Sequence, residues 1–312
     1  MSKYCFGIDI GGTTVKCGLF DTDGNMVENW EIVTQTEDKG SHILSDVAET
    51  IAAKMREKSI GKGDIVGVGV GIPGPVNAKG EVLCAVNLHW DYVNIVDVLG
   101  KLTGLTIKAG NDANVAALGE VWKGGGVGYK NVVMVTLGTG VGGGVISDGH
   151  IIAGANGGAG EIGHIHVDDE IDAACNCGNC GCLEQVASAT GIAKLAVDKL
   201  KETDEPSLLR GVQNISAKSV FDAVKTGDQL AIDVAERFGK YLGKALAAIA
   251  VTVDPEVFVI GGGVSKAGSV IIDYIEIYYR QYVFKGSLHT KFALAKLGND
   301  AGIYGAAKLV IG

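Results

Sequence analysis

Residues 4–20 read YCFGIDIGGTTVKCGLF, and this stretch decides the fold. Apolar and small residues run through residues 4–10 in a pattern that predicts a strand. Gly11 and Gly12 then provide a turn, and a second apolar stretch over residues 15–20 predicts a returning strand. The chain is therefore expected to open with a β-hairpin built around a glycine turn.

A second copy of this hairpin follows at residues 132–146, VVMVTLGTGVGGGVI. It has a predicted strand over 132–137, a glycine turn over 138–140 and a returning strand over 142–146. When the two turns are aligned, an Asp-Gly pair follows each at nearly the same distance, which indicates an internal duplication. Two related units predict an α/β protein with two similar lobes and a ligand cleft between them.

Hydrophobic periodicity indicates the remaining elements. Further strands are expected near residues 26–33, 65–70, 105–109 and 256–260. Helices are expected at residues 41–58, 113–122, 185–201, 216–225, 229–251, 266–284 and 302–310, the last packing back on the first lobe. The expected domains are residues 1–111 with 300–312 as the small lobe and residues 112–299 as the large lobe.

The composition of the 312 residues excludes several classes of protein. A net charge of -9 without any basic block argues against a nucleic-acid partner. No apolar run approaches the roughly 18 residues that a membrane span needs, and the first ten residues carry no export signal, so a cytoplasmic protein is expected. In a reducing compartment the seven cysteines favour a metal site over disulfides.

Four of those cysteines lie in residues 161–184, EIGHIHVDDEIDAACNCGNCGCLE, which also hold two histidines between two glutamates. The spacing of soft thiolates after an imidazole is typical of a tetrahedral zinc site. The candidate ligands are His164, Cys175, Cys177, Cys180 and Cys182. The spacing alone leaves open which four of them bind the metal.

The first glycine turn also has the chemistry of a phosphate site. Gly11 and Gly12 expose consecutive backbone N–H groups, Thr13 adds a hydroxyl and Lys16 adds a positive charge. Asp9, at the end of the strand, is placed to hold a hydrated Mg²⁺ against the phosphates. The alternative is an ordinary tight hairpin capped by Asp9.

Two later glycine clusters extend this hypothesis. The turn at Thr139 and Gly140 has dinucleotide-like spacing, but the chain continues as a strand where a Rossmann loop would open a helix, so NAD binding is disfavoured. A phosphate-facing hairpin fits better. The glycines at 261–263 link a strand to a helix, which suits the adenosine part of a nucleotide or a purely structural turn.

Asn111 and Asp112 stand between a predicted strand and a predicted helix. An aspartate at such a position is commonly a helix cap. The alternative is a general base that accepts a hydroxyl proton during phosphoryl transfer. Nothing in the local sequence separates these two interpretations.

Taken in order, the motifs DIGGTT, GIPGPV, NDAN, LGTGVGGG, GEIGH, CxCGxxGCxE and IGGGVS resemble the ROK family of sugar kinases and sugar-responsive repressors over essentially the whole chain. The cysteine motif after GEIGH is the most specific of them. The chain looks most like the bacterial ATP-dependent glucokinases of that family. The resemblance implies a two-lobed actin-like, ribonuclease H-like ATPase fold. It also implies an enzyme that phosphorylates a hexose, glucose before any other, at the 6-hydroxyl group.

The resemblance also assigns roles to residues. Asp112 matches the catalytic base. The hexose-binding positions match Gly74, Asn87, Asn111, Asp112, Glu161, His164 and Glu184. The Mg-ATP positions match Asp9, Gly11, Gly12, Thr13, Thr139, Gly140, Gly261, Gly262 and Gly263, with Lys16 beside them. The family's structural zinc ligands match His164, Cys175, Cys177 and Cys182.

Two departures from the family pattern affect these assignments. Cys180 occupies a variable position, so an all-cysteine zinc site without His164 is the alternative ligand set. Val86 replaces the proline that many glucokinases carry before Asn87, which bears on the exact contact made by that asparagine.

His166 is expected to point to the opposite face of its segment from His164 and to lie on the surface.

Several functional alternatives belong to the same family. The acceptor could be fructose, mannose, allose or an N-acetylated amino sugar, and polyphosphate could serve as the donor. A sugar-sensing regulator is disfavoured, since the first strand begins by Tyr4 and leaves no room for a preceding helix-turn-helix domain. The resemblance further suggests a homodimer or homotetramer.

Overall fold

The computed structural model describes residues 3–312 and divides them into two units. Unit 1 holds the described residues through Lys130 together with Gly144–Gly160 and Leu297–Gly312, and unit 2 holds Asn131–Gly143 and Glu161–Lys296. This division differs from the expected boundary after residue 111. Helix α4 (Asp112–Lys123) stays in unit 1 because it packs along the last helix, α10 (Ala301–Ile311).

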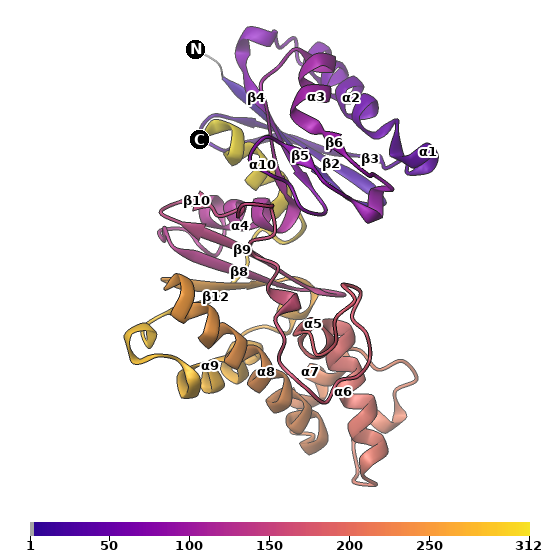
Figure 1. The fold of residues 1–312 in the computed structure, drawn as a ribbon, viewed down its shortest axis with the longest axis vertical. Helices are drawn as coiled ribbons and strands as arrows, with labels where there is room; N and C mark the ends of the chain where they lie inside the picture. Colours follow the sequence, from indigo (N-terminus) through magenta and orange to yellow (C-terminus); the bar gives the residue numbers. More distant parts are fainter. Residues whose placement is uncertain (1–2) are drawn as a thin grey trace. The chain divides into compact units, whose positions relative to one another are not determined.

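The sheet of unit 1 contains the predicted opening hairpin and meander. Its strands are β1 (Tyr4–Ile10), β2 (Thr14–Asp21), β3 (Met26–Val33), β4 (Ile65–Ile72) and β7 (Ile107–Asn111). They lie in the order β3-β2-β1-β4-β7, with β1, β2 and β3 antiparallel and β1, β4 and β7 parallel (Figure 1). The carboxyl ends of three parallel strands therefore meet at one edge of the sheet.

One face of this sheet is covered by α2 (Ile43–Glu57), as its apolar stripe predicts. Phe6 and Ile8 of β1 pack in the same core cluster as Val47 and Ile51 of α2. The sequence patterns did not indicate α3 (Ile95–Thr103), the short helix α1 (Glu37–Gly40) or the small strands β5 (Glu81–Val82) and β6 (Val93–Asn94).

The opposite face of the sheet is covered by α10, which confirms that the final helix packs back on the first unit. Cys5 packs against α10, and a Cβ added at Gly7 or Gly69 would overlap backbone carbonyl oxygens of that helix. The contact between α10 and α4 is equally close, since a Cβ at Gly305 would overlap the carbonyl oxygen of Val115. Glycines thus let the helix backbone rest directly on its neighbours.

The second sheet repeats the arrangement of the first. Its strands are β8 (Val132–Leu137), β9 (Val141–Ser147), β10 (His150–Ile151), β11 (Val257–Gly261) and β12 (Lys291–Leu294). The order β10-β9-β8-β11-β12 matches that of the first sheet strand for strand, with β8, β11 and β12 parallel. The matching order confirms the predicted duplication, and the boundary between the units falls within β9.

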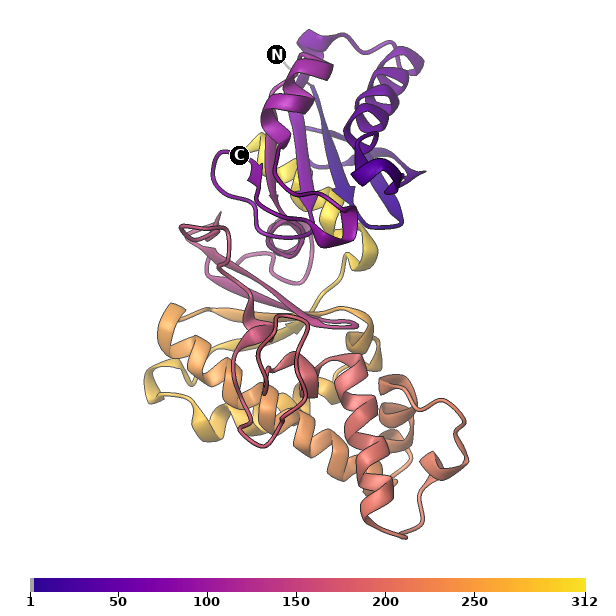
Figure 2. The same ribbon diagram turned by 45° about the vertical axis from the view of Figure 1, so that its right-hand side comes forward.

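The helices of unit 2 are drawn in salmon to orange in Figure 2. They are α5 (Glu184–Ala187), α6 (Ala189–Glu202), α7 (Ala217–Lys225), α8 (Gln229–Val253) and α9 (Val270–Tyr282). The single helix expected at residues 185–201 is broken at Ser188, whose extended backbone and side-chain bond to the Gly191 N–H start α6 anew. Over residues 3–312, no helix is both long and apolar enough to span a bilayer.

The close packing of α10 gives a test of the fold. Gly305→Ala is expected to destabilise the protein by about 1–3 kcal/mol or more, because the new methyl group would overlap the backbone of α4. Gly100→Ala, in α3, is the matched control: its Cβ would meet other atoms only at 3.9 Å or beyond, so the better helix propensity of alanine should stabilise by about 0.5–1 kcal/mol. Urea unfolding measures both changes, and equal effects of the two substitutions would contradict the packing described.

Candidate active site and metal centre

The predicted catalytic residues of unit 1 gather at the carboxyl edge of its three parallel strands. Asp9 near the end of β1 is in register with Gly71 of β4, and Ile72 is in register with Asn111 at the end of β7. Gly74 lies in the loop that follows β4. In α/β sheets this edge is where ligands bind.

Asn111, not Asp112, caps helix α4. The Asn111 Oδ1 accepts from the backbone N–H of Asn114 at 3.1 Å, and its Nδ2 donates to the carbonyl oxygen of Gly74 at 3.1 Å. Asp112 is the first residue of the helix, and its Oδ1 accepts from the N–H of Ala113 at 2.8 Å. The cap interpretation therefore belongs to Asn111, which also fixes the GIPGPV loop beside the catalytic candidate.

Asp9 is a partly buried carboxyl group on the face of the sheet covered by α10. A Cβ at Gly302, in the first turn of α10, would overlap the Asp9 side chain, so the helix admits this carboxyl only because a glycine stands there. Burial, and next the negative charge of Asp112, raises the pKa of Asp9 to about 6, while Lys16 opposes the rise. A divalent cation between the two carboxylates would relieve this repulsion.

The first glycine turn is held in shape by Thr34. The N–H of Thr34 donates to the carbonyl oxygen of Thr13 at 2.9 Å, and its hydroxyl donates to that of Gly11 at 2.7 Å. Gly12 lies close to Asn87, whose carbonyl oxygen would be 3.3 Å from a Cβ at Gly12. The first glycine turn therefore lies next to Asn87, the candidate sugar-binding residue, whose side chain is exposed.

Two further candidates of unit 1 are tied to their surroundings. Lys16 donates from Nζ to the carbonyl oxygen of Asn299 at 3.0 Å, which places its charge near the start of α10. Gly74 has a φ of 98°, a left-handed conformation, and a Cβ there would lie 2.5 Å from the carbonyl oxygen of Cys84. Glycine is required at this position by both conformation and space.

The nucleotide-site candidates of unit 2 gather at the corresponding edge of the second sheet. β8 and β11 are parallel with Gly261 in register with Thr136, so the turns at Thr139, Gly140 and 261–263 lie at one edge. Gly262 has a φ of 81° and leaves no room for a side chain against the carbonyl oxygen of Leu137. The 138–140 turn is bound to the start of α6, since the Thr190 hydroxyl donates to the carbonyl oxygen of Thr139 at 2.8 Å.

The structure brings together the ligand set that the resemblance implied. One ligand atom from each of His164, Cys175, Cys177 and Cys182 lies within 4.8 Å of all the others. The Cys177 and Cys182 sulfurs are 3.6 Å apart, and the Cys175 sulfur is 3.7 Å from Nδ1 of His164. Zinc–sulfur bonds of about 2.3 Å would give tetrahedral edges of about 3.8 Å, so this donor set fits a four-coordinate zinc ion.

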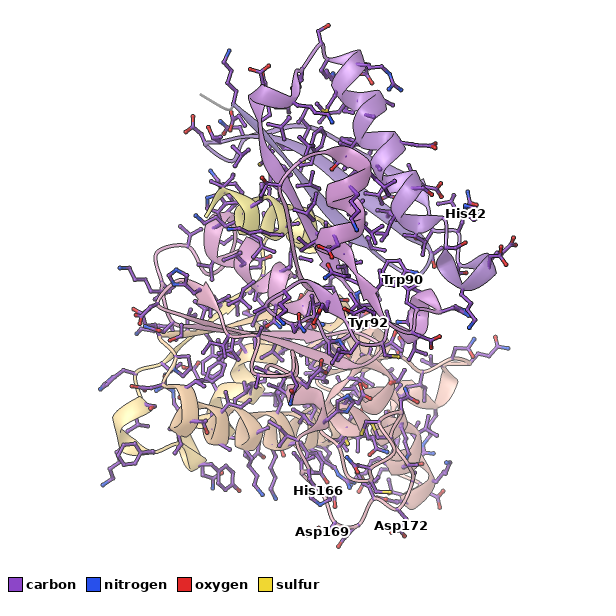
Figure 3. All side chains as sticks on the ribbon, turned by 45° about the horizontal axis from the view of Figure 1, so that its top comes forward. His42, Trp90, Tyr92, His166, Asp169 and Asp172 are labelled. Atoms are coloured by element: carbon purple, nitrogen blue, oxygen red, sulfur yellow. The ribbon has the colours of Figure 1, made fainter. Side chains whose placement is uncertain are left out.

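Cys180 and His166 belong to the same loop but lie outside this cluster. The Cys180 sulfur donates to the carbonyl oxygen of Asp172 at 3.2 Å, which turns it from the other thiols. His166 is exposed, as expected, and its ring contacts Asp169 at 2.8 Å and the carbonyl oxygen of Cys180 at 3.0 Å. His166, Asp169 and Asp172 are labelled in Figure 3.

Glu184 joins the cysteine cluster to the glycine turn at residues 138–140. Its Oε1 accepts from the Cys175 thiol at 3.1 Å, and its Oε2 accepts from the N–H of Val141 at 3.3 Å. A Cβ at Gly140 would overlap that same carboxylate. Glu161, the other glutamate of the segment, is exposed and precedes the short helical turn Ile162–His164.

Sequence reasoning missed the residues that hold these loops. Thr34, Thr190 and Gln185 bind backbone groups of the first turn, the second turn and the cysteine loop. Gln185 acts within its own loop, on Cys182 three residues earlier and on Ala173 twelve residues earlier. Thr34 and Thr190 bond to groups 23 and 51 residues away and leave no local pattern.

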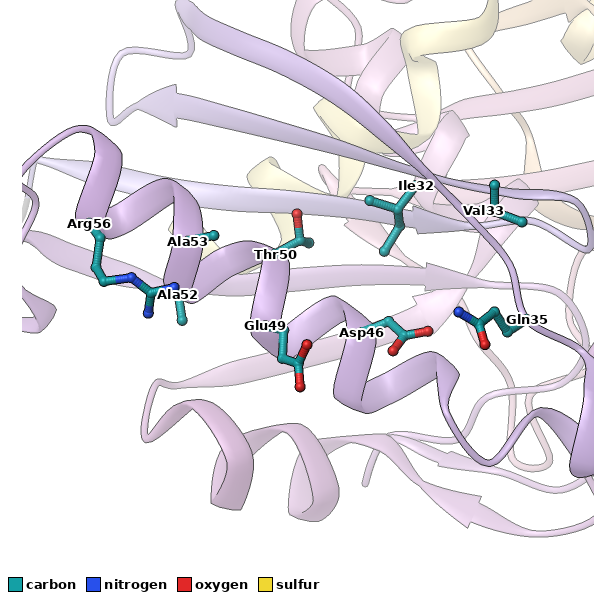
Figure 4. A pocket seen from close by; sticks show the side chains of 9 residues that line it. All are labelled: Ile32, Val33, Gln35, Asp46, Glu49, Thr50, Ala52, Ala53 and Arg56. Atoms are coloured by element: carbon teal, nitrogen blue, oxygen red, sulfur yellow. The ribbon is translucent and has the colours of Figure 1, made fainter.

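A groove of about 540 Å³ lies elsewhere in unit 1, between the edge strand β3 and α2 (Figure 4). Polar groups on its α2 side include Asp46, Glu49 and Arg56, and Ile32 and Val33 line the strand side. None of its nine lining residues was predicted to bind sugar, nucleotide or metal. The groove therefore shares no residue with the predicted site, although Val33 and Gln35 flank Thr34, which holds the first glycine turn.

The profile of the ROK family matches residues 5–312, and the chain belongs to this family. It is 42% identical to a glucokinase of Halalkalibacterium halodurans over 99% of this chain and 95% of that protein. It also resembles the crystal structure of a ROK family glucokinase from Streptomyces griseus in complex with glucose and AMPPNP, with 34% identity, a TM-score of 0.75 and 98% of each chain covered. A ROK hexokinase structure from Thermus thermophilus gives a TM-score of 0.82 at 29% identity, covering 98% of this chain and 97% of that one. These likenesses confirm the predicted sugar-kinase α/β fold.

The raised pKa of Asp9 predicts a pH-dependent stability. Its pKa is about 6 in the folded chain against an ordinary value of 3.8, so folding favours its protonated form. The contribution of protonated Asp9 to the free energy of unfolding is complete below pH 3.8 and is lost as the pH rises through 6. Asp9→Asn should therefore raise the free energy of unfolding at pH 8, without metal, by up to about 3 kcal/mol, with the gain vanishing near pH 4.

Denaturant unfolding of the metal-free protein across this pH range measures the effect. The control is Glu49→Gln, which alters an exposed carboxylate of α2 and should change stability little at any pH. A gain for Asp9→Asn that does not depend on pH would contradict the assignment to the Asp9 charge.

Proposed function

We propose that this chain transfers the γ-phosphate of ATP to the 6-hydroxyl of glucose. Membership of the ROK family and the glucokinase relative at 42% identity over 99% of the chain support this function. The Streptomyces griseus structure carries both glucose and an ATP analogue, which supports the choice of both substrates. The observation within the chain that carries the proposal is the position of Asp112.

Asp112 acts as the general base in this proposal. It is the first residue of α4, at the carboxyl edge of the sheet, and Asn111 performs the capping that Asp112 would otherwise provide. Its carboxylate accepts the proton of the sugar hydroxyl as that oxygen attacks phosphorus. The N–H of Ala113 holds the carboxylate at 2.8 Å and fixes its orientation.

The phosphates are bound by the two glycine turns and Asp9. The first turn supplies Gly11, Gly12 and Thr13, and the second supplies Thr139 and Gly140. Phosphoryl transfer requires positioning and neutralisation of charge more than covalent help. Mg²⁺, when bound, supplies that neutralisation, and Asp9 beside Asp112 is the carboxylate that would hold it. The glycines at 261–263 receive the adenosine part.

Glucose is bound, in this proposal, by the glutamates and the histidine of the cysteine segment, together with the edge of the first sheet. The residues are Gly74, Asn87, Asn111, Glu161, His164 and Glu184. His164, Cys175, Cys177 and Cys182 would hold a zinc ion with four protein ligands and no open position, so zinc would shape the sugar loop and would not activate a nucleophile. The Nδ1 of His164 faces the thiols, which leaves Nε2 for a sugar hydroxyl.

The base assignment predicts the behaviour of Asp112→Asn. Loss of the proton acceptor should lower kcat by about 10²–10⁴-fold, with the KM for glucose changing much less. The control is Asp222→Asn, which removes an exposed carboxylate of α7 and should leave kcat unchanged. Turnover of Asp112→Asn within tenfold of the wild type would contradict the assignment of Asp112 as the base.

The choice of substrates is tested separately, by measuring ADP release with a panel of hexoses and by replacing ATP with polyphosphate.

The ligand set predicts the zinc content of two variants. Cys180→Ser should keep one zinc ion per chain, because the Cys180 sulfur is turned toward the Asp172 carbonyl oxygen. His164→Ala should lose most of its zinc after dialysis, because three thiolates remain without their fourth partner. Atomic emission measures both, and the reverse pattern would establish the all-cysteine site.

A further inference from the structure

Gln185 spans the cysteine loop with both ends of its side-chain amide. Its Oε1 accepts from the backbone N–H of Cys182 at 3.0 Å, and its Nε2 donates to the carbonyl oxygen of Ala173 at 2.8 Å. Ala173 and Cys182 are the flanks of the segment that holds all four cysteines. One side chain on α5 therefore joins the two ends of the metal-binding loop.

The loop between these ends is an irregular hairpin with two glycines. Gly178 and Gly181 have φ values of 91° and 72°, and the carbonyl oxygen of Cys175 accepts from the N–H of Gly178 at 2.9 Å. Its two sides are joined by one isolated backbone pair, Ala174 with Cys180, and a second pair joins Cys182 to His166 in the segment before the loop. Such a loop has few regular backbone bonds, so side-chain bonds contribute much to its shape.

We propose that Gln185 is a positioning residue that sets the spacing of the metal ligands before the metal binds. The proposal rests on the zinc site of the proposed function. Gln185 is not among the four candidate ligands. It acts through the backbone N–H of Cys182 and through the carbonyl oxygen of Ala173, which lies two residues before Cys175. Groups that orient metal ligands in this way typically contribute about 10–100-fold to metal affinity.

The amide of glutamine is suited to this role because it combines one acceptor and one donor on a side chain of this length. Methionine has a similar length and shape but neither hydrogen-bonding group. Asparagine keeps both groups on a side chain one methylene shorter, so it cannot reach both partners. The two substitutions therefore remove the bridge in different ways.

The test is the zinc affinity of Gln185→Met and Gln185→Asn, measured by competition with a chromogenic chelator. Both are expected to bind zinc about 10–100-fold more weakly than the wild type. The control is Gln229→Met, which removes only a surface bond from Gln229 to Asp233 on α8 and should bind zinc normally. If Gln185→Met does not fold, the Gln185→Asn value decides.

Two further readouts separate positioning from a general loss of structure. Hydrogen exchange at the Cys182 amide should become faster in zinc-free Gln185→Met, because its acceptor is gone. The KM for glucose should rise at limiting zinc and return to the wild-type value at saturating zinc, with kcat following zinc occupancy. A residue that contacts the sugar would not be rescued in this way.

The outcomes distinguish this inference from the proposed function. Wild-type zinc affinity in both Gln185 variants, beside a wild type that binds zinc, would overturn the role of Gln185 alone. A wild type that binds no zinc would overturn the zinc assignment and this inference together, while glucose phosphorylation is scored separately by ADP release.

Discussion

The backbone contact of helix α10 with the first sheet and with α4 is the constraint on which the arrangement of unit 1 depends. Gly7 and Gly69 bring the helix onto the strands, and Gly305 brings it onto α4. Since α4 begins with Asp112 and α10 leaves space for Asp9 at Gly302, the same contact sets the position of both carboxylates. A chain with bulkier residues at these glycines would move the candidate base and the candidate magnesium ligand together.

In unit 2, side-chain hydrogen bonds fix the positions of the candidate-site loops. Glu184 contacts the cysteine cluster with one carboxylate oxygen and the end of the second glycine turn with the other. The start of α6 is bonded to that turn through Thr190. Loops of this kind cannot be buried against apolar side chains without leaving backbone groups unsatisfied, so side-chain hydrogen bonds replace the packing that holds α10.

The sequence predicted those parts of the fold that local patterns specify. Both hairpins, the meander, α2, α8 and the final helix appear where periodicity placed them, because each buries a regular apolar face. It missed α3, although Asn94 as its cap and Gly104 after its end were visible signals, and it missed β12, which is only four residues long. It could not assign the cap of α4, because the second bond of Asn111 goes to Gly74, 37 residues away.

The candidate site departs from the rules that made the rest of the chain predictable. A partly buried carboxyl group under a helix, as Asp9 is, opposes folding when it is charged. It is retained at the edge where strands end and ligands would bind. Such conflicts between local stability and residue choice are expected where function, and not folding, selects the residue. The glycine contacts of α10 keep this carboxyl in place, because the surrounding backbone is too closely packed to relax around it.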